Sequence, residues 1–258
     1  MEKKKLRKER NSLVVKHNEL LRNTRYELST TEQKILIYLI SKINKDDKEL
    51  RKVKFDLKEY CEIAGIQTGG ESYIRLKETV RDLSNKSWWI QIDEDHERLF
   101  RWIYGEPEIE KRNGVVDIEL SPTLEPYLIG LQANFTKYEL INVLTLRSSN
   151  SIRLYELFKS YLWQHHWVVE VEEFRRLLNI ENKYPEFKHL KNMMIKPALE
   201  EINTYTDLVV SVETVREGRR IKRLDFTIDE KAGYQLTMDW LLAQDERLGG
   251  VIVGPSDI

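Results

Sequence analysis

The sequence predicts an α+β protein in which one helix, helix, helix, hairpin unit occurs twice. The second copy is clearest at residues 184–206, where apolar residues recur every three or four positions and mark one face of a helix. These apolar positions are Phe187, Leu190, Met194 and Ala198. A shorter amphipathic segment precedes this helix, and two strands joined by a Gly-bearing turn at 216–218 follow it. Two helices followed by a basic hairpin are typical of a winged helix-turn-helix.

The same apolar pattern appears 114 residues earlier in the chain. Eight apolar pairs match in register, namely Phe55 and Val169, Leu57 and Val171, Tyr60 and Phe174, Ile63 and Leu177, Ile66 and Ile180, Tyr73 and Phe187, Leu76 and Leu190, and Val80 and Met194. Upstream of each copy lies a further apolar helix, at 35–43 and at 151–163. The sequence therefore predicts two tandem winged helix-turn-helix domains related by pseudo-twofold symmetry.

We expect the chain to divide into four segments. These are a basic N-terminal arm at 1–12, a first winged-helix domain at 13–130, a second at 131–230 and an acidic C-terminal tail at 231–258. In the first domain, Asn113-Gly114 indicates a two-residue hairpin turn. In the second, Pro197 predicts a kink or a fresh helix start, because proline inside a helix costs ~3 kcal/mol.

The N-terminal residues allow several interpretations. Residues 1–10 are rich in Lys and Arg without hydrophobic periodicity, which is typical of a mobile arm. Leu6, Leu13 and Leu20 lie seven apart and could mark a short dimerising zipper. Residues 13–16 could equally form a first strand attached to the domain.

The net charge of −1 is the sum of basic and acidic segments that nearly cancel. Residues 1–25 hold nine Lys/Arg and three Glu, and residues 183–223 hold nine Lys/Arg and six Asp/Glu. Residues 225–258 hold two basic and seven acidic side chains. Since local fields decide binding to polyanions, the basic blocks favour a nucleic-acid partner.

A winged helix inserts its third helix into the major groove and lays its hairpin along the phosphates. Lys can donate to guanine and Asn can bind adenine in the groove. The candidate DNA-binding residues of the second unit are Lys188, Lys191, Asn192 and Lys196 on the helix, with Arg216, Arg219, Arg220, Lys222 and Arg223 on the hairpin. Those of the first unit are Ser72, Arg75, Lys77, Thr79 and Arg81, with Lys86 at the helix end.

Three segments carry a resemblance to a known family. They read LVVKHNEL at 13–20, LSTTEQKIL at 28–36 and KPALEEINTYTDL at 196–208. With the tandem units, they resemble the replication initiator proteins of theta-replicating plasmids over roughly residues 10–230. The acidic tail from 232 to 258 matches no motif of this family.

The resemblance implies binding to directly repeated origin sequences (iterons) and recruitment of host replication proteins. It also implies that a monomer opens the origin, whereas a dimer paired through the first domain represses the protein's own gene. In this family the second domain reads bases most strongly, in accord with the candidate residues between Lys188 and Lys196.

An enzyme is the first rival interpretation. A DNA-nicking initiator needs a metal held by a His-apolar-His motif, whereas His165 and His166 are adjacent and His17, His96 and His189 stand alone. No GxxxxGK[ST] phosphate loop occurs in the sequence. We therefore expect no catalysis, no metal and no cofactor.

A second rival is a winged-helix transcriptional regulator, or a scaffold that binds proteins instead of DNA. Trp88, Trp89, Trp102, Trp163 and Trp167 could form an adhesive surface, although large aromatics are usually core. The sequence shows neither an apolar run long enough for a membrane span nor a secretory signal, so we expect a cytoplasmic protein. The single Cys61 is expected to be a small buried hydrophobe.

Overall fold

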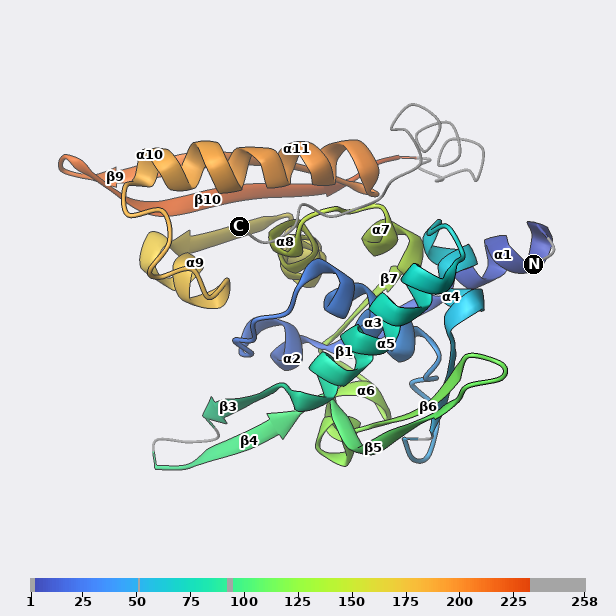
Figure 1. The fold of residues 1–258 in the computed structure, drawn as a ribbon. Coiled ribbons are helices and arrows are strands. Elements are labelled where there is room, and N and C mark those ends of the chain that lie inside the picture. Colours follow the sequence, from blue (N-terminus) through green and yellow to red (C-terminus); the bar gives the residue numbers. More distant parts are fainter. Residues whose placement is uncertain (1–2, 51, 92–94, 233–258) are drawn as a thin grey trace.

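The computed structural model describes residues 3–50, 52–91 and 95–232, and it contains two winged-helix units packed side by side (Figure 1). Each unit is built on a three-stranded antiparallel sheet. The strand order is β2-β6-β5 in the first and β8-β10-β9 in the second, so the strand before the helix pair lies at one edge and the hairpin fills the other two places. The α+β architecture with a repeated winged unit is confirmed.

The elements of the first unit follow helix α1, which spans Lys3–Arg10. They are β1 Leu13–His17, α2 Asn18–Arg22, α3 Thr30–Ser41, β2 Val53–Asp56, α4 Leu57–Ala64, α5 Gly70–Asn85, β3 Ser87–Gln91, β4 Glu97–Arg101, β5 Ile103–Glu110, β6 Val115–Leu120, a 3-10 turn at Pro122–Leu124 and α6 Glu125–Leu128. Ser29 starts α3 with a capping box, in which its hydroxyl accepts from the Glu32 N–H and the Glu32 carboxylate accepts from the Ser29 N–H.

The second unit repeats this order with fewer strands. Its elements are β7 Phe135–Glu139, α7 Leu140–Leu144, α8 Ser149–Tyr161, a 3-10 turn at Leu162–Gln164, β8 His166–Glu170, α9 Val171–Leu177, α10 Phe187–Leu190, a π-helical turn at Lys191–Ile195, α11 Lys196–Tyr205, β9 Leu208–Glu217 and β10 Arg220–Glu230. Helices α4 and α9 begin at Leu57 and Val171, which are the positions matched by the 114-residue offset.

The first unit carries a hairpin that the second unit does not repeat. Strands β3 and β4 pair only with each other among the described strands and project beyond the end of α5 (Figure 1). Strands β3 and β4 are therefore an insertion relative to the second unit. The hairpin equivalent to β9–β10 is β5–β6, which follows it.

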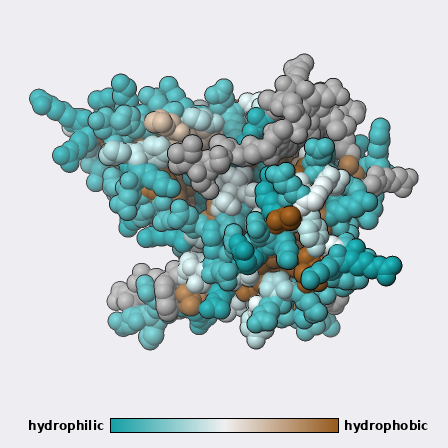
Figure 2. Space-filling view, viewed as in Figure 1, coloured by the Kyte–Doolittle hydropathy of each residue, from teal (hydrophilic) through white to brown (hydrophobic). Residues whose placement is uncertain are grey.

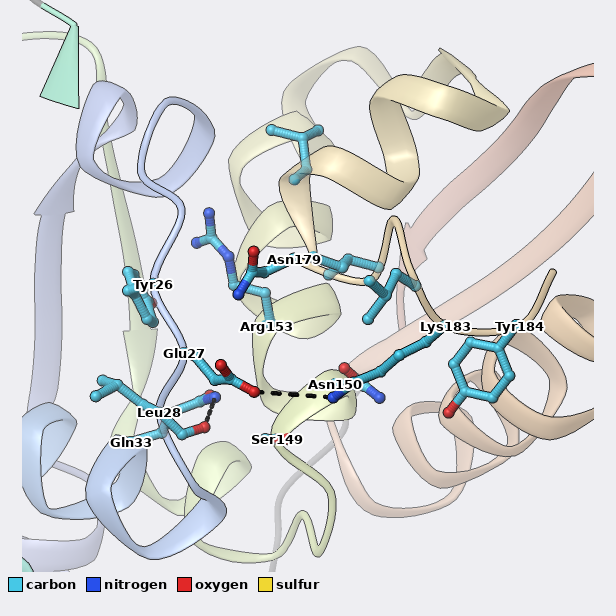
Figure 3. Close-up of a pocket in the computed structure, with 13 residues that line it drawn as sticks. Tyr26, Glu27, Leu28, Gln33, Ser149, Asn150, Arg153, Asn179, Lys183 and Tyr184 are labelled. Atoms are coloured by element: carbon cyan, nitrogen blue, oxygen red, sulfur yellow. Dashed lines mark hydrogen bonds and ion pairs between the residues drawn. The ribbon is translucent and has the colours of Figure 1, made fainter. Parts of the chain in front are cut away.

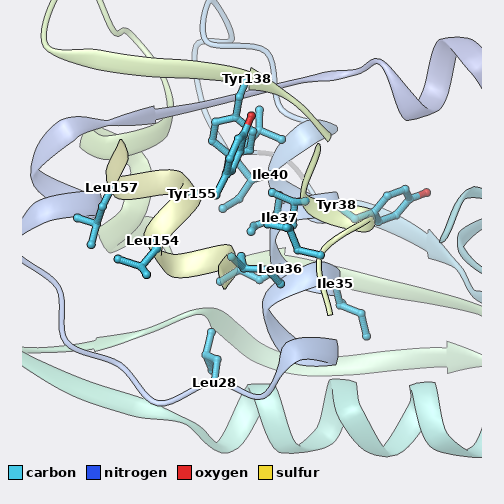
Figure 4. Close-up of a cluster of buried hydrophobic side chains, with 14 of the residues drawn as sticks. Leu28, Ile35, Leu36, Ile37, Tyr38, Ile40, Tyr138, Leu154, Tyr155 and Leu157 are labelled. Atoms are coloured by element: carbon cyan, nitrogen blue, oxygen red, sulfur yellow. The ribbon is translucent and has the colours of Figure 1, made fainter. Parts of the chain in front are cut away.

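A single hydrophobic core runs through both units. Helices α3 and α8, which occupy equivalent places in the repeat, contact each other, and Figure 4 shows side chains from both in one cluster. Strand β1 leaves the first unit and pairs with β7, for example Val15 with Lys137. The units therefore share their interior and a two-stranded sheet.

A buried ion pair lies where this shared sheet meets α8. The Lys16 Nζ is 2.6 Å from Glu156 Oε1, and both side chains are almost completely buried. The Tyr138 hydroxyl donates to the same carboxylate oxygen. Burial lowers the pKa of Lys16, and the Glu156 carboxylate opposes that change.

The structure corrects two expectations about the N-terminus. The basic segment expected to be a mobile arm forms helix α1, with Arg10 buried. Leu6, Leu13 and Leu20 lie on α1, β1 and α2, so they do not form the continuous helix that a zipper requires. The alternative of a first strand at 13–16 is confirmed by β1.

The hairpin turn at Asn113-Gly114 is longer than expected. Glu110 pairs with Val115, so residues 111–114 form a four-residue connection. Gly114 has φ 69, and a Cβ there would lie 3.2 Å from the Tyr73 ring, which explains why glycine ends this loop.

The large aromatics are mostly core. Trp88, Trp102 and Trp167 are buried, whereas Trp163 is exposed. The side chain of Trp89 is not among the side chains that the structure describes. Cys61 is buried as expected.

The acidic tail from residue 233 onward lies outside the described residues. Among those residues, no helix is long and apolar enough to span a bilayer.

Breaking the buried ion pair should destabilise the fold strongly. In Lys16→Met the Glu156 carboxylate keeps its burial but loses its cation, which costs about 3 to 5 kcal/mol. The double variant Lys16→Met/Glu156→Leu should recover a large part of that loss. Urea titrations of the three chains measure these free energies of unfolding, and a loss below about 1 kcal/mol in Lys16→Met would contradict the assignment.

Lys34 should make stability rise with pH in the alkaline range. Burial lowers the pKa of Lys34 to about 8, and its Nζ donates to the Leu144 carbonyl oxygen at 2.8 Å. Between pH 8 and the unfolded pKa of 10.5, the unfolded chain binds more protons, so raising the pH favours the folded state.

From pH 7 to 9.5 this rise should amount to about 2 kcal/mol. Urea titrations across that range measure it, and Lys34→Met should remove it. The same slope in both proteins would show that Lys34 is not its source. Buried tyrosines with raised pKa values act with the opposite sign above pH 10, so the range ends below that point.

Candidate nucleic-acid interface

The third helix of the second unit presents one apolar face inward and one polar face outward. Leu190, Met194 and Ala198 are buried as the sequence predicts. Lys188, Asn192 and Lys196 are exposed and make no ion pair with described side chains, whereas Lys191 is half-buried. Met193 is also exposed, at 67%. The exposed positions therefore combine two lysines, an amide and a flexible apolar side chain.

Pro197 is accommodated by a π-helical turn. The Lys196 N–H bonds to the Lys191 carbonyl, five residues back, and α11 begins there with Pro197 in its first turn. Proline supplies no N–H and its ring crowds the carbonyl four residues earlier, so a widened turn relieves both problems. The chain stays helical from α10 through α11, so a widened turn takes the place of the expected kink or fresh helix start, and this turn carries Lys191 and Asn192.

The hairpin of the second unit has a basic tip. Glu217 pairs with Arg220, so Gly218 and Arg219 form a two-residue turn in which Gly218 takes φ 61. The hairpin side chains predicted to bind DNA are all exposed, namely Arg216, Arg219, Arg220, Lys222 and Arg223. Lys222 lies 4.0 Å from Glu170, an exposed pair that binding to phosphate could replace at little cost.

The first unit positions its predicted residues less uniformly. On α5, Leu76, Val80 and Leu83 face the core, and Arg75 and Lys77 are exposed. The hydroxyl of Ser72 donates to the Gln67 carbonyl, and Arg81 bonds to the neighbouring Asp82. Arg75 and Lys77 are thus available for an external anion, while Ser72 and Arg81 already have partners within the helix region.

Two basic residues at the first hairpin were not among the predicted candidates. Lys111 and Arg112 are exposed in the β5–β6 connection, the place that corresponds to Gly218 and Arg219 in the second unit. The Asn113-Gly114 turn sequence that follows them could have placed these two residues in the hairpin loop. The face seen in Figure 2 is mostly hydrophilic, with small apolar patches.

Comparisons with known proteins identify the family. Residues 13–159 match the model described as initiator replication protein, WH1, and residues 170–228 match initiator Rep protein, WH2. The chain belongs to the initiator replication protein family.

Relatives extend over much of the chain. A replication initiation protein of Escherichia coli is 28% identical over 229 residues, which cover 84% of this chain and 69% of the relative. The PI protein of Escherichia coli is 30% identical over 152 residues, which cover 51% of this chain and 48% of the relative. The crystal structure of the Pi initiator protein in complex with iteron DNA has a TM-score of 0.74 and 21% identity, covering 86% of this chain and 99% of that one. This last similarity shows the fold.

Two lysines that flank the third helices contact the loop between α2 and α3. Lys86, at the end of α5, donates to the Glu27 carbonyl at 3.1 Å and pairs with Glu32 at 2.7 Å. Lys183, just before α10, lies 3.8 Å from the Glu27 carboxylate. The loop between α2 and α3 therefore links both helices through charge.

A polar cavity of about 100 Å³ lies beside this loop, between the units (Figure 3). Arg153 on α8 donates to the Thr24 carbonyl at 2.8 Å and places its guanidinium 5.1 Å from the centre of the Tyr26 ring. Burial raises the pKa of Tyr26 to about 12, so this phenol stays neutral at physiological pH. These contacts fix the relative position of the two units.

Two adjacent histidines contact surface carboxylates. His165 Nδ1 is 2.9 Å from Asp229, and His166 pairs with Asp225. Within residues 3–50, 52–91 and 95–232, no group of three or more His, Cys, Asp or Glu side chains is arranged to hold a metal ion.

Helix and hairpin substitutions should affect DNA binding differently. Lys191→Ala or Asn192→Ala should lower discrimination between DNA sequences by about 1 to 3 kcal/mol, the loss expected when a side chain that reads a base is removed. Arg219→Ala should weaken all duplexes alike and reduce the slope of log affinity against log salt by about 1.

Titrations of specific and scrambled duplexes at several salt concentrations measure both effects. Arg219→Lys keeps the charge and serves as the matched control. Equal losses across sequences in all three alanine variants would contradict the division of roles.

Proposed function

We propose that the chain is a plasmid replication initiator that binds directly repeated origin sequences. The observation that carries the proposal is the pairing, twice in one chain, of an exposed basic third helix with a basic hairpin. Family membership supports the initiator role. The solved relative was crystallised with iteron DNA, which supports the choice of DNA target.

In this proposal the two units act as a covalent pseudo-dimer. We assign their limits as 13–130 and 131–230. Helices α5 and α10–α11 enter major grooves one turn apart, about 34 Å or ~10.5 bp, so one chain covers roughly 20 bp. Because the units differ in sequence, the site is non-palindromic. Arg75 and Lys77 contact one half, and Lys188 to Lys196 contact the other.

The remaining parts of the proposal concern regulation and partners. A monomer acts at the origin, and a dimer paired through the first domain represses the chain's own gene. Host replication proteins are recruited to the bound complex in the cytoplasm. The chain binds and remodels DNA without catalysis of its own, in accord with its family.

Selection of bound sequences from random duplex DNA, followed by footprinting at near-physiological salt, tests this function. We expect one non-palindromic site of about two helical turns, with a mass by light scattering that corresponds to one chain per duplex. A variant that combines Arg75→Ala and Lys77→Ala should shorten the footprint on one side only. Recovery of palindromic sites held by two chains, with no single-chain site among the selected sequences, would contradict the proposal, as would failure to enrich any sequence.

A further inference from the structure

Helix α1 is unusually basic for an ordered helix. Six of its eight residues are Lys or Arg, in the sequence KKKLRKER. Leu6, Glu9 and Arg10 face the protein, whereas Lys3, Lys4, Lys5, Arg7 and Lys8 are exposed. Lys3, Lys4, Arg7 and Lys8 make no ion pair with any described side chain. Lys3 with Arg7, and Lys4 with Lys8, place like charges four residues apart, an arrangement that destabilises a helix on its own.

The inward face holds α1 firmly against α4. Arg10 donates from Nε to the Ile63 carbonyl at 2.7 Å and from Nη2 to the Glu62 carbonyl at 3.2 Å. These carbonyls lie at the C-terminal end of α4, where a cation is favourable. Lys42 bridges Glu9 at 2.5 Å and Glu59 at 3.5 Å. The four outward charges are therefore held in a defined place.

Helix α1 lies beside the N-terminal end of α5, the end that the proposed function places in the DNA groove. Helix α4 ends at Ala64, Gly65 adopts φ 70, and α5 begins at Gly70, so α1 packs at the turn between the two helices (Figure 1). In a helix-turn-helix the first helix crosses the phosphate backbone and the N-terminal residues of the second contact base edges. The outward face of α1 is thus placed at the backbone that flanks the half-site of α5.

We propose that α1 is a phosphate-binding element that extends the DNA contact beyond the half-site read by α5. Its partner is the sugar-phosphate backbone of duplex DNA, bound without base preference. Binding would replace the repulsion among Lys3, Lys4, Arg7 and Lys8 with attraction to phosphates and release counterions. This inference rests on the proposed function of the chain in DNA binding.

A charge-removal variant tests the proposal in the full chain. Lys3→Gln/Lys4→Gln/Arg7→Gln/Lys8→Gln should lose hydroxyl-radical protection on one flank, outside the half-site of α5, on the duplex recovered by selection. The slope of log affinity against log salt should become shallower by about 3.6, since each of the four lost phosphate contacts removes about 0.9. Base preference should not change. The charge-preserving variant Lys3→Arg/Lys4→Arg/Arg7→Lys/Lys8→Arg should behave as the unaltered chain.

Arg10→Gln tests whether the docked position matters. It keeps all four outward charges but removes the bonds to the carbonyls of Glu62 and Ile63. Flank protection should disappear and the salt slope should become shallower, because charges that are no longer docked do not hold the flanking phosphates. Circular dichroism and urea titration confirm that each variant folds before it is compared.

Different outcomes separate this inference from the proposed function. If the unaltered chain selects and protects no duplex, the proposed function fails. If it protects its site and the quadruple variant gives the same footprint and salt slope, α1 does not bind the backbone and the inference is overturned. The inference is also overturned if the quadruple variant keeps its DNA binding but loses binding to phosphatidylserine vesicles, because α1 would then serve a membrane surface.

Discussion

The buried pair of Lys16 and Glu156 constrains the arrangement of the whole chain. Two charges removed from water are tolerated only when their geometry and additional hydrogen bonds compensate for lost hydration. Here the 2.6 Å contact and the Tyr138 hydroxyl, both at Glu156 Oε1, provide part of that compensation. The three residues come from β1, α8 and β7, so these elements must all be in place together. Because they join the two units, the core that separates α5 from α10–α11 has one preferred geometry.

The repeat and most core positions could be predicted because they depend on local periodicity. Leu57 and Val171 begin equivalent helices, as the 114-residue offset indicates. The β3–β4 insertion could not be recognised as such, because its alternating pattern resembles that of any hairpin. Leu6 and Leu20 were open to a zipper interpretation because sequence spacing does not reveal that α1, β1 and α2 are separate elements.

The candidate interface was predictable in position but not in detail. Lys188 and Asn192 are exposed because they lie on the helix face opposite the buried apolar residues, and Arg219 is exposed because it lies in the hairpin turn. The internal partners of Ser72 and Arg81 depend on local conformation at Gln67 and Asp82, which periodicity does not specify. The charge network around Glu27 joins residues distant in sequence and emerges only from packing of the two units.

The position of β1 has a consequence for synthesis of the chain. Lys16 meets a partner 140 residues later, and β1 pairs with a strand that begins at Phe135. At bacterial translation rates of about 5 to 20 residues per second, β1 leaves the ribosome on the order of ten seconds before α8. Until Phe135–Glu139 has been made, the backbone groups of β1 lack the strand with which they pair. A chaperone that binds such unpaired segments would have its opportunity during this interval, before the ion pair closes.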